Sequence, residues 1–170
     1  MESYLRLARI EELDQIYTIL EEGRRFLKDQ GLPQWQGGYG PTKHGTQEEL
    51  EEGQGYAFIY QGRLSGYLAL QTDTQDLLEG AWEVFPQKKL AVIKHVAMAD
   101  STRGKGLGKK MLEDSLRAAF VLGYEDVRID THKDNVVMQK LIASLGFARR
   151  GVLDLGFPNG MREAYQFIVG

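Results

Sequence analysis

The sequence predicts an α/β fold in which a mixed β-sheet of about seven strands is flanked by about four helices, in a single domain over residues 1–170. A hairpin of two alternating segments precedes a strand–helix–strand–helix–strand order in the second half of the chain. This order is typical of a mixed sheet with helices packed on it. The 170 residues are enough to bury roughly 70% of the unfolded surface in one core. No repeat, linker-like stretch or low-complexity segment divides the sequence.

The chain begins with a predicted strand and two predicted helices. Residues 4–9 alternate in hydrophobicity, which indicates a strand. Residues 10–30 carry an apolar stripe at helical spacing and end near Gly31, which predicts an amphipathic helix. The members of the stripe are Leu13, Ile16, Tyr17, Leu20 and Leu27. Thr46, with Glu49 three residues later, predicts a capping box at the start of a second helix.

A hairpin, a polar connection and a central strand come next. Residues 56–60 and 64–70 alternate on either side of a Gln-Gly-Arg turn and predict two paired strands. Residues 73–80 are polar and predict a loop, with a short helical turn as the alternative. Leu90–Met98 is a mainly apolar run that predicts a strand, and residues 109–122 have the periodicity of a helix.

Three strands and a helix complete the predicted fold. Alternating apolar residues indicate a strand over residues 127–131. The helix after it has an apolar stripe and should end at Gly146. That stripe consists of Met138, Leu141, Ile142 and Leu145. Residues 148–155 and 162–169 flank a Pro-Asn-Gly turn signal and predict the last two strands.

The most informative segment is Arg103-Gly104-Lys105-Gly106-Leu107-Gly108, which joins the central strand to the following helix. A helix N-terminus offers unpaired N–H groups and a positive dipole end, and glycines let the backbone approach a ligand closely. Positive charge comes from Arg103, Lys105, Lys109 and Lys110. This segment, called the glycine loop below, therefore predicts a site for a phosphorylated ligand, with a flexible basic turn as the alternative.

The spacing of the glycine loop disfavours two common phosphate-binding motifs. A P-loop requires a Ser or Thr directly after its lysine, and neither follows Lys109. A dinucleotide-binding fingerprint requires G-x-G-x-x-G after the first strand and an acidic residue about 20 residues later. Here the glycines run G-x-G-x-G and come late in the chain. A nucleotide-binding regulatory domain is therefore disfavoured.

The chain resembles the GNAT superfamily of acyl-CoA-dependent N-acyltransferases in two linked motifs. Arg103-x-x-Gly106-x-Gly108 is similar to the family signature Q/R-x-x-G-x-G/A, and Val96-Ala97-Met98 resembles the hydrophobic strand before it. Further residues fit the downstream pattern N-x-x-A-x-x-L-Y-x-K-x-G-F: Asn135, Leu141, Gly146 and Phe147. Met138 and Ser144 depart from that pattern.

The resemblance implies transfer of the acetyl group of acetyl-CoA to an amine. Backbone N–H groups of the glycine loop would hold the pyrophosphate, and Val96 and Met98 would pair through their main chains with the pantetheine arm. The Val96 N–H would polarise the thioester carbonyl, which is worth roughly 3 kcal/mol in acyl transfer. Asn135 either caps a helix or also touches the arm. The implied cofactor-binding set is Val96, Ala97, Met98, Arg103, Gly104, Lys105, Gly106, Leu107, Gly108, Lys109 and Asn135, without a metal.

Proton handling is where the sequence departs from the family. The tyrosine that often protonates the departing thiolate is replaced by Ile142, a modest loss because a thiol has a pKa of about 8.5. An alkyl ammonium with a pKa of about 10.4 is neutral only about once in 2,500 at pH 7, a deficit of about 4.6 kcal/mol. The positions where the family often has its base hold Lys94 and Val92.

Other side chains are candidate acids and bases. His132 follows the strand over residues 127–131, at the edge where the sheet of the family splays, and is either a base or a solvated loop histidine. Tyr165 either donates to the thiolate or packs in the sheet. His95 alternates away from Lys94 and is therefore expected on the opposite face of the sheet. Glu83 lies just upstream of the central strand and could reach the cleft. The predicted catalytic set is His132, Tyr165 and Val96.

The acceptor pocket is expected within residues 26–44, the most variable region of the family. Trp35 and Tyr39 place two large aromatic rings in a glycine-rich connection. They either shape a pocket for the amine, in part through cation–π contact, or pack this connection against the rest of the domain. Lys94, if it faces the cleft, would favour an acceptor that carries a carboxylate or phosphate. The predicted substrate-binding set is therefore Trp35, Tyr39 and Lys94.

Composition narrows the functional classes. A net charge of −3 gives no reason to expect nucleic acid as a partner. The absence of cysteine rules out disulfides and a cysteine nucleophile, and no apolar run is long enough for a membrane span, so we expect a cytoplasmic enzyme.

The expected partner is a small-molecule or peptide amine, and a homodimer is possible by analogy with the family. The leading function is an N-acetyltransferase, and the alternative is a non-catalytic acyl-CoA-binding sensor with a degenerate site.

Overall fold

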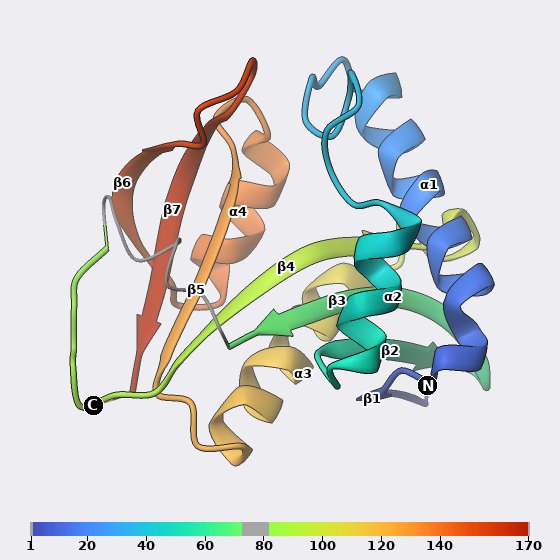
Figure 1. The fold of residues 1–170 in the computed structure, drawn as a ribbon, viewed down its shortest axis with the longest axis horizontal. Coiled ribbons are helices and arrows are strands. Elements are labelled where there is room, and N and C mark those ends of the chain that lie inside the picture. Colours follow the sequence, from blue (N-terminus) through green and yellow to red (C-terminus); the bar gives the residue numbers. More distant parts are fainter. Residues whose placement is uncertain (1, 73–81, 170) are drawn as a thin grey trace.

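The computed structural model describes residues 2–72 and 82–169. A seven-stranded sheet, in the order β1-β2-β3-β4-β5-β7-β6, forms its centre (Figure 1). The strands are β1 (Ser3–Leu7), β2 (Gly55–Tyr60), β3 (Arg63–Gln71), β4 (Leu90–Met98), β5 (Asp126–His132), β6 (Ala148–Asp154) and β7 (Met161–Ile168). All neighbouring pairs are antiparallel except β4 and β5, which are parallel. The predicted mixed sheet is confirmed.

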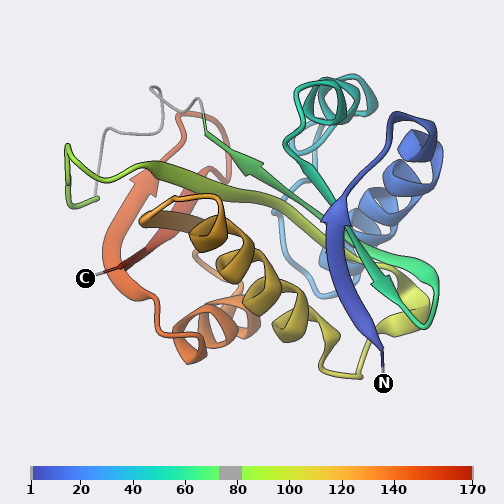
Figure 2. The same ribbon diagram turned by 90° about the horizontal axis from the view of Figure 1, so that it is seen from below.

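Four α-helices cover the two faces of the sheet. They are α1 (Leu13–Asp29), α2 (Lys43–Glu51), α3 (Leu107–Val121) and α4 (Val136–Ser144). Figure 2 shows α1 and α2 on one face and α3 and α4 on the other. Single 3₁₀ turns, η1 (Ile10–Glu12) and η3 (Asp100–Thr102), precede α1 and the glycine loop. Over residues 2–72 and 82–169 the number of helices agrees with the prediction, and each helix of the second half follows a strand, as the sequence pattern requires.

Each face of the sheet has its own hydrophobic core. The apolar stripe of α1 buries Ile16 and Leu20 completely against β3 and β4. On the opposite face, Met111 and Leu112 of α3 and Ile142 of α4 are almost fully buried against the sheet. Burial of each such side chain contributes about 1.5–3 kcal/mol. The core therefore holds β4 rigidly between two helical layers.

The predicted start of the second helix was wrong. The helix begins at Lys43, and Thr42 is the N-cap, whose Oγ1 accepts a hydrogen bond from the Gly45 N–H at 2.9 Å. Thr46 is buried inside the helix and donates its hydroxyl to the Thr42 carbonyl. Thr42 is preferred because it has the extended backbone that an N-cap requires. Glu49 therefore belongs to the buried face of α2 instead of closing a capping box.

The parallel pairing of β4 and β5 is short, and this opens the sheet. The register runs only from Leu90 opposite Asp126 to Ile93 opposite Ile129. Beyond Ile93 the remaining residues of β4 pair only with β3, through an irregularity between Tyr67 and Ala69. The edge of β4 that faces β5 therefore carries unpaired main-chain groups next to Val96.

Some sequence predictions lie outside the described residues. The loop expected over residues 73–80 falls in the segment 73–81, which the structure does not describe. Over residues 2–72 and 82–169, no helix combines the length and apolar character that a bilayer span requires. The same ranges contain no group of three or more His, Asp or Glu side chains arranged to hold a metal ion.

Candidate active site

Two cavities meet at Val96, where β4 separates from β5. The first, called the loop cavity, has a volume of about 340 Å³ and lies between α1, the end of β4 and the starts of α3 and α4. The second, called the bulge cavity, has about 270 Å³ and lies between β4, β5 and the β6–β7 turn. Both are lined by Gln34, Trp35, Val96 and Met138. The two cavities are therefore adjacent at these residues.

The glycine loop is built to leave the first turn of α3 open. Gly104 and Gly106 have φ angles of 78° and 72°, in the left-handed region that favours glycine. Gly106 is the N-cap of α3, and no side chain caps that turn. The first N–H groups of α3 therefore stay available to an anion, and the helix dipole favours negative charge there. Residues 103–110 include no acidic residue, so this donor set fits a pyrophosphate.

The predicted cofactor-binding residues divide into two groups. Six line the loop cavity: Val96, Ala97, Met98, Arg103, Gly108 and Asn135. Arg103 donates to the Met98 carbonyl at 3.0 Å and to Asp100, and it stacks over Phe26. Outside the cavity lining, Gly104, Lys105 and Gly106 are exposed on the loop and Lys109 is exposed on the first turn of α3, whereas Leu107 is buried in the core.

Asn135 links the two walls of the loop cavity. Its Oδ1 accepts the Met138 N–H at 3.2 Å and so caps α4, as one of the two sequence interpretations expected. Its Nδ2 donates to Oε1 of Gln34 at 3.2 Å, across from the connection between α1 and α2. Because Gln34 and Met138 also line the bulge cavity, this contact lies where the two cavities join.

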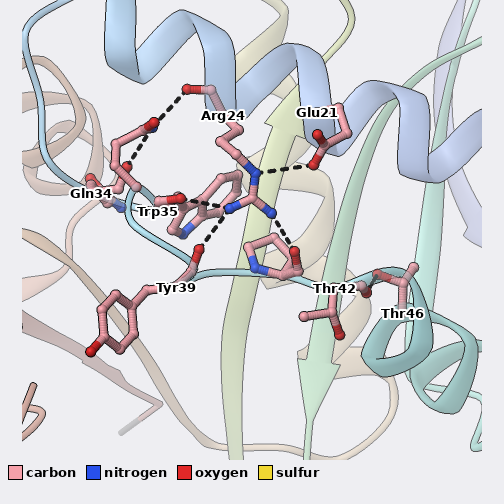
Figure 3. A network of polar contacts seen from close by, with 9 residues as sticks. Glu21, Arg24, Gln34, Trp35, Tyr39, Thr42 and Thr46 are labelled. Atoms are coloured by element: carbon pink, nitrogen blue, oxygen red, sulfur yellow. Dashed lines mark hydrogen bonds and ion pairs between the residues drawn. The ribbon is translucent and has the colours of Figure 1, made fainter.

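Arg24 of α1 fixes the connection that carries Trp35. Its guanidinium donates to the carbonyls of Trp35 and Tyr39, both at 2.6 Å, and to that of Pro41, while Nε donates to Glu21 (Figure 3). The Trp35 backbone has a positive φ of 68° and is held in this conformation by these contacts. The result is a rigidly held aromatic side chain that borders both cavities.

Trp35 lies at the site, whereas Tyr39 lies one layer behind it. Trp35 lines both cavities, and its ring meets that of His95 edge-on with centroids 6.5 Å apart. Tyr39 lines neither cavity and stacks on Phe157 at 4.5 Å. Phe157, from the turn between β6 and β7, lines the bulge cavity.

Charged side chains from three strands line the bulge cavity. Lys94 comes from β4, Asp130 from β5 and Arg162 from β7. Burial raises the pKa of the Asp130 carboxyl above its usual range, although Lys94 and Arg162 oppose that shift. Burial also lowers the pKa of the Arg162 guanidinium, and Asp130, at 3.9 Å, partly compensates. The cavity therefore holds more positive than negative charge.

Comparison with known protein families identifies the chain. The model of the acetyltransferase (GNAT) family matches residues 13–147. The chain belongs to the GNAT acetyltransferase family. Its fold and its enzyme class, that of an acyltransferase, follow from this membership and from many similar solved structures. No protein of curated function matches the sequence.

Solved GNAT structures resemble this chain over almost its full length. An acetyltransferase of the GNAT family from Streptococcus agalactiae has 28% identity and a TM-score of 0.84, covering 99% of this chain and 96% of its own. Aminoglycoside acetyltransferase AAC(6')-Ib, in complex with coenzyme A, has 22% identity and a TM-score of 0.70, with 98% and 95% coverage. The protein yncA from Salmonella typhimurium, with its cofactor acetyl-CoA, has 18% identity and a TM-score of 0.71, with 100% and 95% coverage.

In this GNAT fold, two predicted catalytic side chains lie away from both cavities. His132 is only 1% exposed, its Nδ1 accepts the Asp134 N–H, and burial lowers the pKa of its imidazole. Tyr165 is 5% exposed within the core of the α3 face, and burial raises the pKa of its phenol. Neither lines the loop cavity or the bulge cavity.

His95 is the site residue that sequence reasoning misplaced. Strict alternation put it on the face opposite Lys94, but the irregularity in β4 gives His95 a φ of 57° and turns it to the bulge cavity beside Lys94 and Val96. Asp130 and Arg162 also line the bulge cavity and were not predicted from the sequence. The alternation of polar residues with the apolar residues of β5, at positions 128, 130 and 132, was the available signal for Asp130.

Proposed function

We propose that this GNAT protein transfers the acetyl group of acetyl-CoA to a primary amine of a small molecule, amino acid or peptide by direct attack in a ternary complex. The observation that carries the proposal is the junction of the two cavities at Val96. One cavity adjoins the open first turn of α3, which suits a pyrophosphate, and the other is lined by charged side chains that suit a polar acceptor.

Each part of the site has a role in this proposal. Acetyl-CoA supplies an activated acetyl thioester when it is bound. The N–H groups at the start of α3 hold its pyrophosphate, and the unpaired edge of β4 holds its pantetheine arm. The Val96 N–H donates to the thioester oxygen, where a preorganised donor contributes roughly 3 kcal/mol.

The chemical step needs a base more than an acid. The amine nitrogen forms a bond to the carbonyl carbon, the carbon–sulfur bond breaks, and the amine loses a proton. Ile142, at the position of the usual tyrosine, is fully buried and has no proton to donate. The thiol of coenzyme A has a pKa near 8.5, so it departs as a thiolate without large cost. Removal of the amine proton is the harder task near pH 7.

The acceptor is proposed to carry a carboxylate or phosphate beside its amine. Lys94 and Arg162 present two cations to the bulge cavity, and Asp130 presents one buried carboxyl. A plain polyamine would bring several positive charges toward these cations, which is unfavourable. An acidic group on the acceptor would pair with Lys94 or Arg162, and its amine would point toward Val96.

Replacement of Lys94 tests this acceptor class. Lys94→Met is expected to raise the KM for an anionic amine, such as an amino acid, at least 10-fold while leaving the KM for acetyl-CoA unchanged. A charge-assisted hydrogen bond is worth about 1.5–3 kcal/mol, which corresponds to that change. Lys43→Met, at an exposed lysine of α2, is the matched control and should change neither constant. Activity on polyamines alone would contradict the assignment.

Binding of the cosubstrate is tested by thermal unfolding. Acetyl-CoA and coenzyme A at 100 times their Kd should each stabilise the protein by about 2.7 kcal/mol. In a chain of this size, that raises Tm by about 5–10 °C. Equal concentrations of ATP and NAD serve as controls and should have a smaller effect. No shift with either CoA species, or a larger shift with ATP or NAD, would contradict the proposal.

A non-catalytic acyl-CoA sensor is the second candidate function. The observation in its favour is the buried Ile142, because the site lacks the usual tyrosine. A sensor would show the same stabilisation by acetyl-CoA but no turnover with any amine.

A further inference from the structure

A buried carboxylate lies directly behind His95. Glu49, on α2, is 5% exposed, and its Oε2 lies 2.7 Å from Nδ1 of His95. Tyr67 donates its hydroxyl to Oε1 at 2.8 Å, and Gln71 donates to Oε2 at 3.0 Å. Burial alone would raise the pKa of the Glu49 carboxyl, but His95 and these two hydrogen bonds together hold it below its usual range. The carboxylate is therefore kept ionised and fixed in orientation.

His95 separates two cavities. It lines the bulge cavity and also a third cavity of about 360 Å³, called the α2 cavity, bounded by α2 and the end of β3. Its Nδ1 is engaged by Glu49, whereas Nε2 has no hydrogen-bond partner among the described residues. The His95 backbone has a φ of 57°, a left-handed conformation that is strained for a non-glycine residue, and such strain concentrates at functional sites.

We propose that His95 is the general base of acetyl transfer and that Glu49 is the residue that positions it. This inference rests on the proposed acetyl transfer. The Glu49 carboxylate accepts Nδ1–H, which leaves the lone pair on Nε2. Nε2 first takes a proton from the ammonium group of the acceptor. The freed amine nitrogen then bonds to the acetyl carbon, the carbon–sulfur bond breaks, and the second proton of that nitrogen passes to the departing thiolate. The imidazolium then returns the proton to water in the α2 cavity, and neutral His95 is restored.

The charges around His95 direct the proton away from the acceptor. Its surroundings include groups from four other elements and from its own strand. They are Glu48 and Glu49 of α2, Glu52 at the C-cap of α2, Tyr67 and Gln71 of β3, Asp130 of β5, Arg162 of β7 and Lys94 of β4. On the side of the bulge cavity, the cations Lys94 and Arg162 oppose the positive charge that His95 gains with the proton. On the side of the α2 cavity, the carboxylates of Glu48, Glu49 and Glu52 attract this charge. The proton therefore leaves toward the α2 cavity.

The test is the pH dependence of turnover in His95→Asn. Asn suits this variant because it tolerates a left-handed backbone better than most residues do. We expect kcat at pH 7 to fall about 10²–10⁴-fold, with the KM for acetyl-CoA unchanged. The loss should shrink as pH rises toward the pKa of the amine, about 10.4, because the free amine then needs no base. Added imidazole should restore part of the activity at pH 7.

Two further variants separate positioning from structural support. Glu49→Gln keeps a side-chain oxygen for Tyr67 but removes the charge behind Nδ1, so kcat should fall at least 10-fold with an altered pH profile. His44→Gln, at an exposed histidine on the same helix, is the matched control and should leave the profile unchanged.

The outcomes distinguish this inference from the proposed function. Wild-type kcat in His95→Asn at pH 7, or a loss that is the same at every pH, would overturn the role of His95 while acetyl transfer stands. No turnover by the wild-type protein with any amine would overturn both proposals together.

Discussion

Asp126→Asn is expected to lower the free energy of unfolding by about 3–5 kcal/mol, the largest effect on stability that we predict. Asp126 and Arg128 form an ion pair at 3.0 Å in which both side chains are only 2% exposed. Gln166 donates to the same carboxylate at 2.9 Å. Removal of one charge leaves the other buried without compensation, which costs far more than the pair itself contributes. Denaturant unfolding at pH 7 measures the change.

A matched control shows whether burial causes the effect. Asp14→Asn makes the same chemical change in the exposed pair between Asp14 and Lys43, and surface pairs of this kind contribute little. The two variants should therefore differ clearly in their denaturation midpoints. Equal midpoints would contradict the view that the buried pair supports the start of β5.

Gly106→Val is expected to weaken acetyl-CoA binding about 100-fold. Gly106 has a φ of 72° at the N-cap of α3, and a β-branched residue adopts this backbone only with strain of about 1–3 kcal/mol. Relief of that strain would turn the first N–H groups of α3 away from the pyrophosphate site. Isothermal titration with coenzyme A measures the loss directly.

Gly123→Val is the control for this substitution. Gly123 follows the C-terminal end of the same helix, has a φ of 91° and, like Gly106, has open space where a Cβ would lie. Both variants should lose similar stability, but only Gly106→Val should lose affinity for coenzyme A. Equal affinities in the two variants would argue against the glycine loop as the pyrophosphate site.

The secondary structure could largely be predicted from the sequence because periodicity is a local property. The β4 strand, Leu90–Met98, has the predicted bounds. Of the predicted α1 stripe, Ile16 and Leu20 are buried, whereas Leu13, Tyr17 and Leu27 are half-buried. The start of α2 was wrong because two threonines compete for the N-cap, and only the backbone at Thr42 is extended. The order of the last strands, with β7 between β5 and β6, depends on long-range pairing that periodicity does not encode.

The glycine loop was predictable from the sequence, whereas the candidate base was not. The loop motif lies in consecutive residues, so its spacing is visible. The position of His95 depends on an irregularity in β4 that breaks the alternation on which the prediction relied. Its partner Glu49 is 46 residues away, on a helix whose start was misplaced. Contacts of this separation arise only from the packing of α2 on the sheet.

The three polar side chains that converge on Glu49 show how the fold and the site depend on each other. Tyr67 and Gln71 belong to β3, and His95 belongs to β4. A buried carboxylate is costly unless it is paired and hydrogen-bonded. The packing of α2 on the sheet therefore depends on the same contacts that are proposed to orient the base.

Acetyl transfer at the junction of the two cavities is measured most directly in a reaction that follows both products. Purified protein is mixed with acetyl-CoA and a panel of primary amines, with and without an acidic group. Free thiol and acetylated amine are then quantified in the same samples. We predict that the two products form in equal amounts and fastest with an acidic amine. Binding of acetyl-CoA without formation of acetylated amine would contradict enzymatic transfer and favour an acyl-CoA sensor.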